Sequence, residues 1–240
     1  MKKLIKQVGR TFGIEIGRIS PVISGVSKRK RLMDGYHVDL LIDVGANKGQ
    51  FALESRESGY QGKIFSIEPL SDAHNILLQN SENDHNWIVA PRCATGSEDG
   101  HVEINISGNS VSSSILPMLE SHSDVAPKST YVGTEQTPLC RLDTLTGDYC
   151  VDAESVFLKI DTQGYEQQVL LGAPKTLKKA KMIQIELSLV PLYGGQMLMF
   201  DMINELHKVG FEVFDLVPIL FNAASGRLLQ VDGLFVRKVQ

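Results

Sequence analysis

The sequence lacks the usual signatures of a disulfide scaffold and of a metal site. Its 240 residues include only three cysteines, Cys93, Cys140 and Cys150. An odd number of cysteines without close spacing argues against a disulfide framework and for a reducing compartment. The six histidines are scattered without the paired spacing of metal ligands. We therefore predict no zinc or magnesium site.

Long hydrophobic runs are also absent. No apolar stretch approaches the roughly 18 residues that a membrane-spanning helix needs. The basic start at residues 1–6 is not followed by a continuous apolar region, which argues against a secretory signal peptide. A hydrophobic content of 42% is nevertheless ample for a core. The sequence therefore predicts a cytoplasmic α/β protein.

Basic residues are scarce outside the N-terminus. Residues 1–31 carry nine basic residues and one acidic residue, whereas the whole chain has 24 basic and 28 acidic residues. The acidic body is unsuited to nucleic acid, and we predict a basic N-terminal arm or helix over residues 1–37. Apolar residues at helical spacing in residues 1–20 favour packing on the core or on a partner subunit. The alternative is a peripheral contact of residues 1–31 with anionic lipid at the inner face of a membrane.

A glycine turn between a strand and a helix is the central feature of the remaining chain. Residues 38–42 are apolar and favour a strand buried on both faces, and residues 50–53 have helical composition. Gly45 and Gly49 bracket the turn, and Asn47 tolerates a positive φ better than most residues. Such a turn presents free N–H groups at the start of the helix, where a ligand can be held.

The residues around this turn favour S-adenosylmethionine over a dinucleotide. Their spacing differs from the G-x-G-x-x-G fingerprint, and Asp43 lies where a carboxylate would repel phosphates. Glu68 ends the next predicted strand, at residues 63–68, where an acid can accept hydrogen bonds from ribose hydroxyls. S-adenosylmethionine carries an ammonium and a ribose but no phosphate. A NAD-dependent reductase is the less favoured alternative.

Five motifs in the chain resemble those of the FkbM-type methyltransferases, in the family's order. They lie at residues 43–49, 66–69, 142–145, 157–166 and 232–237, and the run Lys-Ile-Asp-Thr-Gln-Gly-Tyr-Glu at 159–166 is the most specific. Strand patterns count to seven from residue 38. The resemblance implies a class I, Rossmann-like domain over residues 38–240, with an open, mostly parallel sheet and helices on both faces. It also implies that the last two strands form an antiparallel edge.

The resemblance places the cofactor at the carboxyl ends of the first four strands. The loop after the third strand should pass near the adenine. The implied cofactor-binding residues are Asp43, Gly45, Ala46, Asn47, Gly49, Glu68, Pro69, Ala94, Thr95 and Asp161.

Two carboxylates are candidate catalytic groups, because a general base helps a hydroxyl acceptor lose its proton. Asp161 follows the fourth strand and Glu186 ends the fifth. The alternative role of Asp161 is to cap the following helix, and that of Glu186 is a buried carboxylate paired with Lys159 or a tyrosine. The place after the fourth strand lacks the Asn/Asp-Pro-Pro-aromatic motif of N-methylating enzymes, which favours oxygen as the acceptor.

Residues 101–145 interrupt the alternation of strands and helices. A long irregular insertion beside a cofactor site is typical of a substrate lid, although an ordinary surface excursion is the alternative. We predict O-methylation of a hydroxyl on a sugar, glycan or natural product, with a non-catalytic S-adenosylmethionine-binding scaffold protein as the alternative. Glu166 is also a candidate first-turn helix acid. The candidate substrate residues are Ser112, Ser113, Gln163, Glu166 and Tyr193.

Overall fold

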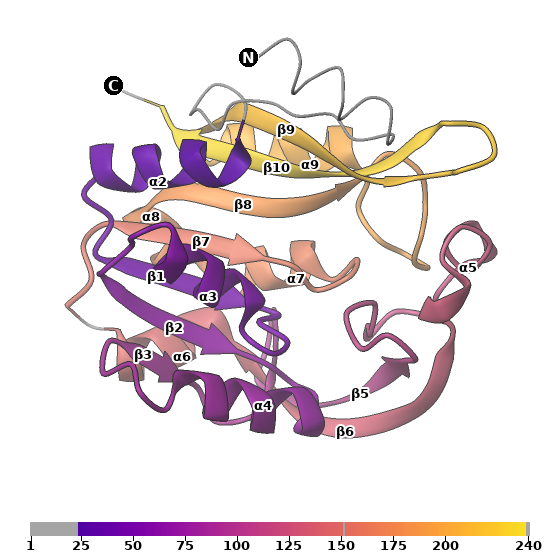
Figure 1. Ribbon diagram of the computed structural model, residues 1–240, viewed down its shortest axis with the longest axis horizontal. Helices are drawn as coiled ribbons and strands as arrows, with labels where there is room; N and C mark the ends of the chain where they lie inside the picture. Colours follow the sequence, from indigo (N-terminus) through magenta and orange to yellow (C-terminus); the bar gives the residue numbers. More distant parts are fainter. Residues whose placement is uncertain (1–23, 151, 239–240) are drawn as a thin grey trace, which may run out of the picture.

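A seven-stranded sheet forms the centre of the protein, in the order β3-β2-β1-β7-β8-β10-β9 (Figure 1). The computed structural model describes residues 24–150 and 152–238. Five neighbouring strands pair parallel with one another: β1 (Leu40–Val44), β2 (Lys63–Ile67), β3 (Trp87–Val89), β7 (Val156–Ile160) and β8 (Ala180–Ser188). The predicted open, mostly parallel sheet is thus confirmed.

The last strand enters the sheet in the opposite direction. β10 (Leu228–Arg237) pairs antiparallel with β8 on one side and with β9 (Phe211–Phe221) on the other. The short connection at residues 222–227 forces a hairpin, whereas β9 is reached through a helix and runs with the parallel strands. The expected antiparallel edge is therefore confirmed: the last two strands, β9 and β10, pair antiparallel at the edge of the sheet, and β10 alone of the described strands in this sheet is reversed.

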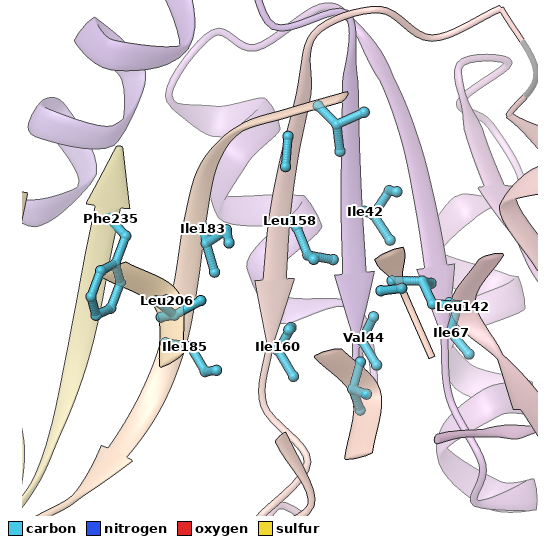
Figure 2. Packing of buried hydrophobic residues seen from close by; sticks show 14 of the residues in the cluster. Ile42, Val44, Ile67, Leu142, Leu158, Ile160, Ile183, Ile185, Leu206 and Phe235 are labelled. Atoms are coloured by element: carbon cyan, nitrogen blue, oxygen red, sulfur yellow. The ribbon is translucent and has the colours of Figure 1, made fainter. Parts of the chain in front are cut away.

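Helices cover both faces of the sheet, as predicted, because the strands alternate their apolar side chains between two clusters. Leu41 packs with α2 (Gly25–Gly35), α3 (Gln50–Glu57) and α4 (Ser71–Ser81). Ile42 and Val44 point to the other face (Figure 2). That face is covered by α6 (Leu142–Tyr149), α7 (Glu166–Leu171), α8 (Pro174–Lys179) and α9 (Met199–Lys208). Every residue of β1 is buried, as expected for a strand covered on both sides.

The predicted insertion at residues 101–145 contains a small sheet of its own. β5 (Gly100–Ser107) pairs antiparallel with β6 (Tyr131–Arg141), and β6 also pairs with β4 (Ala94–Gly96). The connection between β5 and β6 includes α5 (Glu120–Ser123) and the short 3-10 helix η1 (Pro127–Ser129). This β5–β6 excursion, residues 100–141, lies at the carboxyl ends of the parallel strands (Figure 1). A substrate lid would need that position.

The basic run that precedes β1 is held against the body of the protein. Within α2, Lys28 pairs with Asp215 at 2.5 Å and Arg29 with Glu54 at 2.5 Å. Lys30 pairs with an aspartate one helical turn away. The rest of the predicted arm, including the amphipathic pattern of residues 1–20, lies outside the described residues. In residues 24–150 and 152–238, no helix is long and apolar enough to cross a membrane.

Candidate active site

A cavity of about 390 Å³ opens at the carboxyl ends of β1, β2 and β7, where ligands bind in open α/β sheets. Its wall combines the turn after β1, the end of β2, β4, the β5–β6 excursion and the turn after β7. Ten of the residues predicted from the sequence line it: Gly45, Ala46, Asn47, Glu68, Pro69, Ala94, Thr95, Ser113, Asp161 and Gln163.

The glycines of the turn are required by close contacts within the protein. Gly45 has φ +75°, and a Cβ there would lie 1.9 Å from the carbonyl oxygen of Asp161. Gly49 has φ +87°, and its Cβ would meet the ring of Trp87 at 2.8 Å. Gly49 starts α3 and does not line the cavity. The two glycines therefore let the β1 turn approach its neighbours, while Gly45 also exposes backbone to the cavity.

Glu68 presents a buried carboxyl group to the cavity. Its Oε2 accepts a hydrogen bond from the Asn47 amide at 2.8 Å, and its Oε1 accepts one from the Leu70 amide at 2.9 Å. The side chain is 4% exposed, and burial raises the pKa of Glu68 to about 7. Each oxygen retains a further lone pair. The group is thus able to accept hydrogen bonds from two neighbouring hydroxyls, such as those of a ribose.

The wall next to Glu68 combines apolar side chains with one unpaired hydroxyl. Leu70, Ala94, Ile104 and Ile115 line this part of the cavity. The Oγ1 of Thr95 is buried there and has no hydrogen-bond partner within residues 24–150 and 152–238. A buried hydroxyl without a partner is costly, and a ligand that bonds to it removes this cost. An apolar slot with one free hydroxyl suits a purine ring.

Asp43 lies beneath the turn and does not reach the cavity. It is fully buried, and the Lys159 Nζ lies 3.1 Å from its Oδ1 without the angles of a hydrogen bond. Lys159 also lies 3.4 Å from Asp161 and donates a hydrogen bond to the Gly45 carbonyl. Burial alone would lower the pKa of Lys159, but the two carboxylates reverse this effect and raise it. Asp43 therefore anchors a charged Lys159 instead of contacting a ligand directly.

The two candidate catalytic carboxylates have different positions. The Asp161 side chain is 36% exposed and faces the cavity. Glu186 does not line the cavity, and it is linked to Asp161 through the Gln163 amide, which donates to Asp161 Oδ1 at 2.8 Å and to Glu186 Oε2 at 2.6 Å. Burial and the neighbouring carboxylates raise the pKa of Glu186 well above its ordinary value. A carboxyl group that is protonated at neutral pH is a poor proton acceptor.

Three of the candidate substrate residues lie behind the cavity wall. The Oε1 of Glu166 accepts hydrogen bonds from the amides of Thr162 and Gly164, as a first-turn helix acid does. Tyr193 is fully buried, and its hydroxyl donates to Gln163. Ser112 is bonded to neighbours in the β5–β6 excursion. These side chains support the site from behind and do not line the cavity.

Sequence reasoning missed several residues that line the cavity. Asp232 accepts a hydrogen bond from Gln184 at 3.2 Å, and the two residues come from neighbouring strands β10 and β8. Burial, followed by the nearby Asp161, raises the pKa of Asp232 to about 6. The motif at residues 232–237 was a usable signal for Asp232. The missed set also includes Gln50, Phe51 and Glu54 on α3, and Ser110 and Ile115 in the excursion.

The fold is that of a class I methyltransferase, because it is a mostly parallel seven-stranded sheet with one reversed strand and a cavity at the carboxyl ends of its parallel strands. The model of the methyltransferase FkbM domain matches residues 43–213, and the chain belongs to this family. The cofactor is S-adenosyl-L-methionine, as predicted. The Glu68 carboxyl group, the apolar slot and the unpaired Thr95 hydroxyl fit its nucleoside part. The NAD-dependent alternative is not supported.

Individual relatives are distant. The chain is 25% identical over 154 residues to the hexuronic acid methyltransferase AglP of Haloferax volcanii, a match that covers 62% of this chain and 56% of that protein. The chain thus spans little more than half the length of this relative. A Listeria monocytogenes structure assigned as an S-adenosylmethionine dependent methyltransferase has a TM-score of 0.49 and 10% identity, over 90% of this chain and 99% of that one. Aeropyrum pernix fibrillarin with bound S-adenosyl-L-methionine has a TM-score of 0.44 and 10% identity, over 82% and 66% of the chains.

Proposed function

We propose that this S-adenosylmethionine-dependent methyltransferase methylates a hydroxyl group of a sugar or glycan, with Asp161 as the general base. The observation that carries the proposal is the position of Asp161, a partly exposed carboxylate on the cavity wall. Glu186, the other candidate, does not line the cavity and lies behind Gln163. Oxygen as the acceptor is supported by the turn sequence at residues 161–164.

The bound cofactor would supply an electrophilic methyl group, and its transfer to a hydroxyl releases one proton. Asp161 is held ready to receive that proton. Its Oδ1 accepts a hydrogen bond from Gln163, and its Oδ2 faces the Lys159 ammonium at 3.4 Å. These two contacts fix the orientation of the carboxylate. Such a base is worth about 10²–10⁴-fold in rate.

The end of the cavity around Asp161 supports a hydroxyl-rich acceptor. Gln184 and Asp232 provide an amide and a carboxylate group that pair with hydroxyls. The distant relative, named a hexuronic acid methyltransferase, also points to a sugar. Natural-product hydroxyls remain a second acceptor class for the assay.

The charges at this end favour a neutral sugar over a sugar acid. Asp161, Asp232 and Glu54 all line the cavity. The nearby cations already have partners, because Lys159 is paired with Asp43 and Asp161, and Arg29 is paired with Glu54. A carboxylate on the acceptor would therefore meet like charges, which costs free energy. We expect a neutral glycoside to be methylated faster than the matching uronide.

The proposal is tested in two stages. Calorimetric titration with S-adenosylmethionine, S-adenosylhomocysteine and NAD should show binding of the first two ligands alone. Methyl transfer to methyl glucoside, to methyl glucuronide, to oligosaccharides and to phenolic natural products is then followed by mass spectrometry. Gain of one methyl on a sugar hydroxyl supports the proposal. Transfer only to a natural product would overturn the sugar assignment, and cofactor binding without any transfer would favour the scaffold alternative.

A further inference from the structure

Gln163 occupies a backbone conformation that its side chain does not favour. Its φ is +55°, in the left-handed region, although it is not a glycine. The residue is 8% exposed, and its carbonyl oxygen accepts a hydrogen bond from the Ser114 hydroxyl at 2.7 Å. Such conformations persist where the surrounding structure enforces them, and they cluster at functional sites. Here the enforced turn directs the Gln163 amide under Asp161.

Every polar atom of that amide has a partner. Nε2 donates to Asp161 Oδ1 at 2.8 Å and to Glu186 Oε2 at 2.6 Å, and Oε1 accepts from the Tyr193 hydroxyl at 2.6 Å. The reverse orientation of the amide would place its oxygen against two carboxyl groups. The Tyr193 hydroxyl, which has a single proton, therefore fixes which end of the amide faces Asp161.

Tyr193 is in turn held by the β5–β6 excursion. Its hydroxyl lies 3.2 Å from the Ser112 carbonyl oxygen, and its ring meets the His122 ring edge-on at 5.1 Å. The backbone amide of Gly194 donates to Pro117, and that of Leu119 donates to Leu192. The chain segment that carries Tyr193 is thus fastened to residues 112–122 on both sides.

We propose that Gln163 and Tyr193 are positioning residues that couple the placement of Asp161 to the seating of the β5–β6 excursion over the cavity. The link runs from the excursion, which holds the Tyr193 ring against His122, through the Tyr193 hydroxyl and the Gln163 amide to Asp161 Oδ1. The excursion also supplies Ile104, Ser110 and Ile115 to the cavity wall. Displacement of the excursion therefore removes part of the cofactor slot and releases the amide that orients the base. This inference rests on the role of Asp161 proposed above.

Tyr193→Phe removes only the linking hydroxyl. Tyr131→Phe is a matched control, because the Tyr131 hydroxyl donates to the Leu116 carbonyl within the same excursion, whereas the Tyr193 hydroxyl bonds to Gln163. We expect Tyr193→Phe to lower kcat about 10- to 100-fold, the range for residues that orient a functional group from behind, with little change in S-adenosylhomocysteine affinity. Gln163→Met should act in the same way. Equal losses in Tyr193→Phe and Tyr131→Phe, or cofactor affinity that falls together with kcat, would overturn the proposal.

A second measurement does not need the acceptor. Coupling between two sites is reciprocal, so a substitution of Asp161 should change the stability of the β5–β6 excursion. Hydrogen exchange of residues 110–122 with S-adenosylhomocysteine bound should be faster in Asp161→Ala than in the wild type. Asp232→Ala, which changes a cavity carboxylate that bonds to Gln184 and not to Gln163, should leave this exchange unchanged.

In the Tyr193→Phe background, Asp161→Ala should add no further exchange, because the link is already broken. Unchanged exchange in Asp161→Ala, or additive effects in the double variant, would reject the coupling. If no sugar is methylated, the proposed function fails while this exchange experiment still decides the inference.

Discussion

The two ends of the cavity are built in different ways. The cofactor end, comprising Gly45, Asn47, Glu68, Ala94 and Thr95, consists of turns that directly follow parallel strands, and much of its bonding uses backbone amides. The acceptor end depends on side chains that meet from β7, β8, β10 and the loop at residues 192–194. The first arrangement follows from a strand-turn-helix pattern, whereas the second exists only after the sheet has assembled.

The two ends also differ in charge. At the cofactor end a single buried carboxyl group, Glu68, is satisfied by two backbone amides. At the acceptor end burial and the nearby Asp161 carboxylate raise the pKa of Glu186 and of Asp232, and Lys159 offsets part of that repulsion. The cofactor end is therefore suited to recognition by hydrogen bonds, and the acceptor end to handling a proton.

Among the substitutions that distinguish the two ends, Asp161→Ala should have the largest effect, and that effect is on turnover. Removal of the base should lower turnover about 100- to 10,000-fold. Cofactor affinity should change only a few-fold, because the Glu68 carboxyl group keeps both of its bonds to backbone amides. Steady-state kinetics and titration with S-adenosylhomocysteine measure the two quantities separately. Turnover that survives the substitution would remove Asp161 from the role of base.

Gly45→Ala tests the close contact between the turn after β1, at the cofactor end, and the Asp161 backbone, at the acceptor end. The added Cβ would lie 1.9 Å from the Asp161 carbonyl oxygen, in addition to the strain of φ +75°. We expect the free energy of unfolding to fall by about 2–4 kcal/mol. Gly226→Ala is the control, because Gly226 has φ +71° but no heavy atom within 4 Å of its Cβ position. Equal losses of stability in urea titrations of the two variants would show that the contact with Asp161 is unimportant.

Glu68→Ala separates the cofactor end from the acceptor end. Loss of the carboxyl group should weaken S-adenosylmethionine binding by about 1–3 kcal/mol, the cost of removing a charged hydrogen-bond partner. Turnover at saturating cofactor should change much less. Glu135→Ala is a suitable control, because Glu135 bonds to Ser71 and Arg92 and does not line the cavity. Calorimetry that gives the same cofactor affinity for the two variants would count against the role of Glu68.

Sequence reasoning predicted the cofactor end of the cavity better than the acceptor end. The strands, the glycine turn and Glu68 are readable because each depends on residues within one short stretch. The antiparallel edge was expected from the family resemblance alone, and the places of β10 and Asp232 depend on strand order, which no local pattern encodes. The burial of Asp43 beside Lys159 was not readable, because a buried carboxylate and a ligand-binding one look alike in sequence. Tyr193 and Glu166 were predicted as substrate residues, but the sequence does not show that their side chains lie behind the cavity wall.

The supporting acid Glu166 should make stability depend on pH. Burial raises its pKa from 4.5 to about 7, so the folded state retains a proton that the unfolded state releases between these values. Its contribution to stability therefore declines as the pH rises from about 4.5 to about 7. In Glu166→Gln, the side-chain amide oxygen would still accept the hydrogen bonds from Thr162 and Gly164.

In urea titrations we expect the free energy of unfolding of Glu166→Gln to exceed that of the wild type by about 1–2 kcal/mol at pH 8. Near pH 4.5 the two proteins should be equally stable. Part of the wild-type slope should remain in the variant, because burial also raises the pKa of Glu68 to about 7. A variant with the full wild-type slope would show that Glu166 is ionised in the folded protein.

The smallest effect on turnover is expected from Glu186→Gln. This substitution tests whether Asp161 alone, and not Glu186, accepts the proton at the acceptor end. Burial and the neighbouring carboxylates raise the pKa of Glu186 and so favour its neutral form, whose shape and charge glutamine copies. The new amide oxygen can still accept from Gln163 Nε2. Turnover should therefore stay within about threefold of the wild type, in contrast to the loss in Asp161→Ala. If Glu186→Gln instead lost as much turnover as Asp161→Ala, the proton would pass through both carboxyl groups, and the wall formed by Gln163 would be part of the proton path.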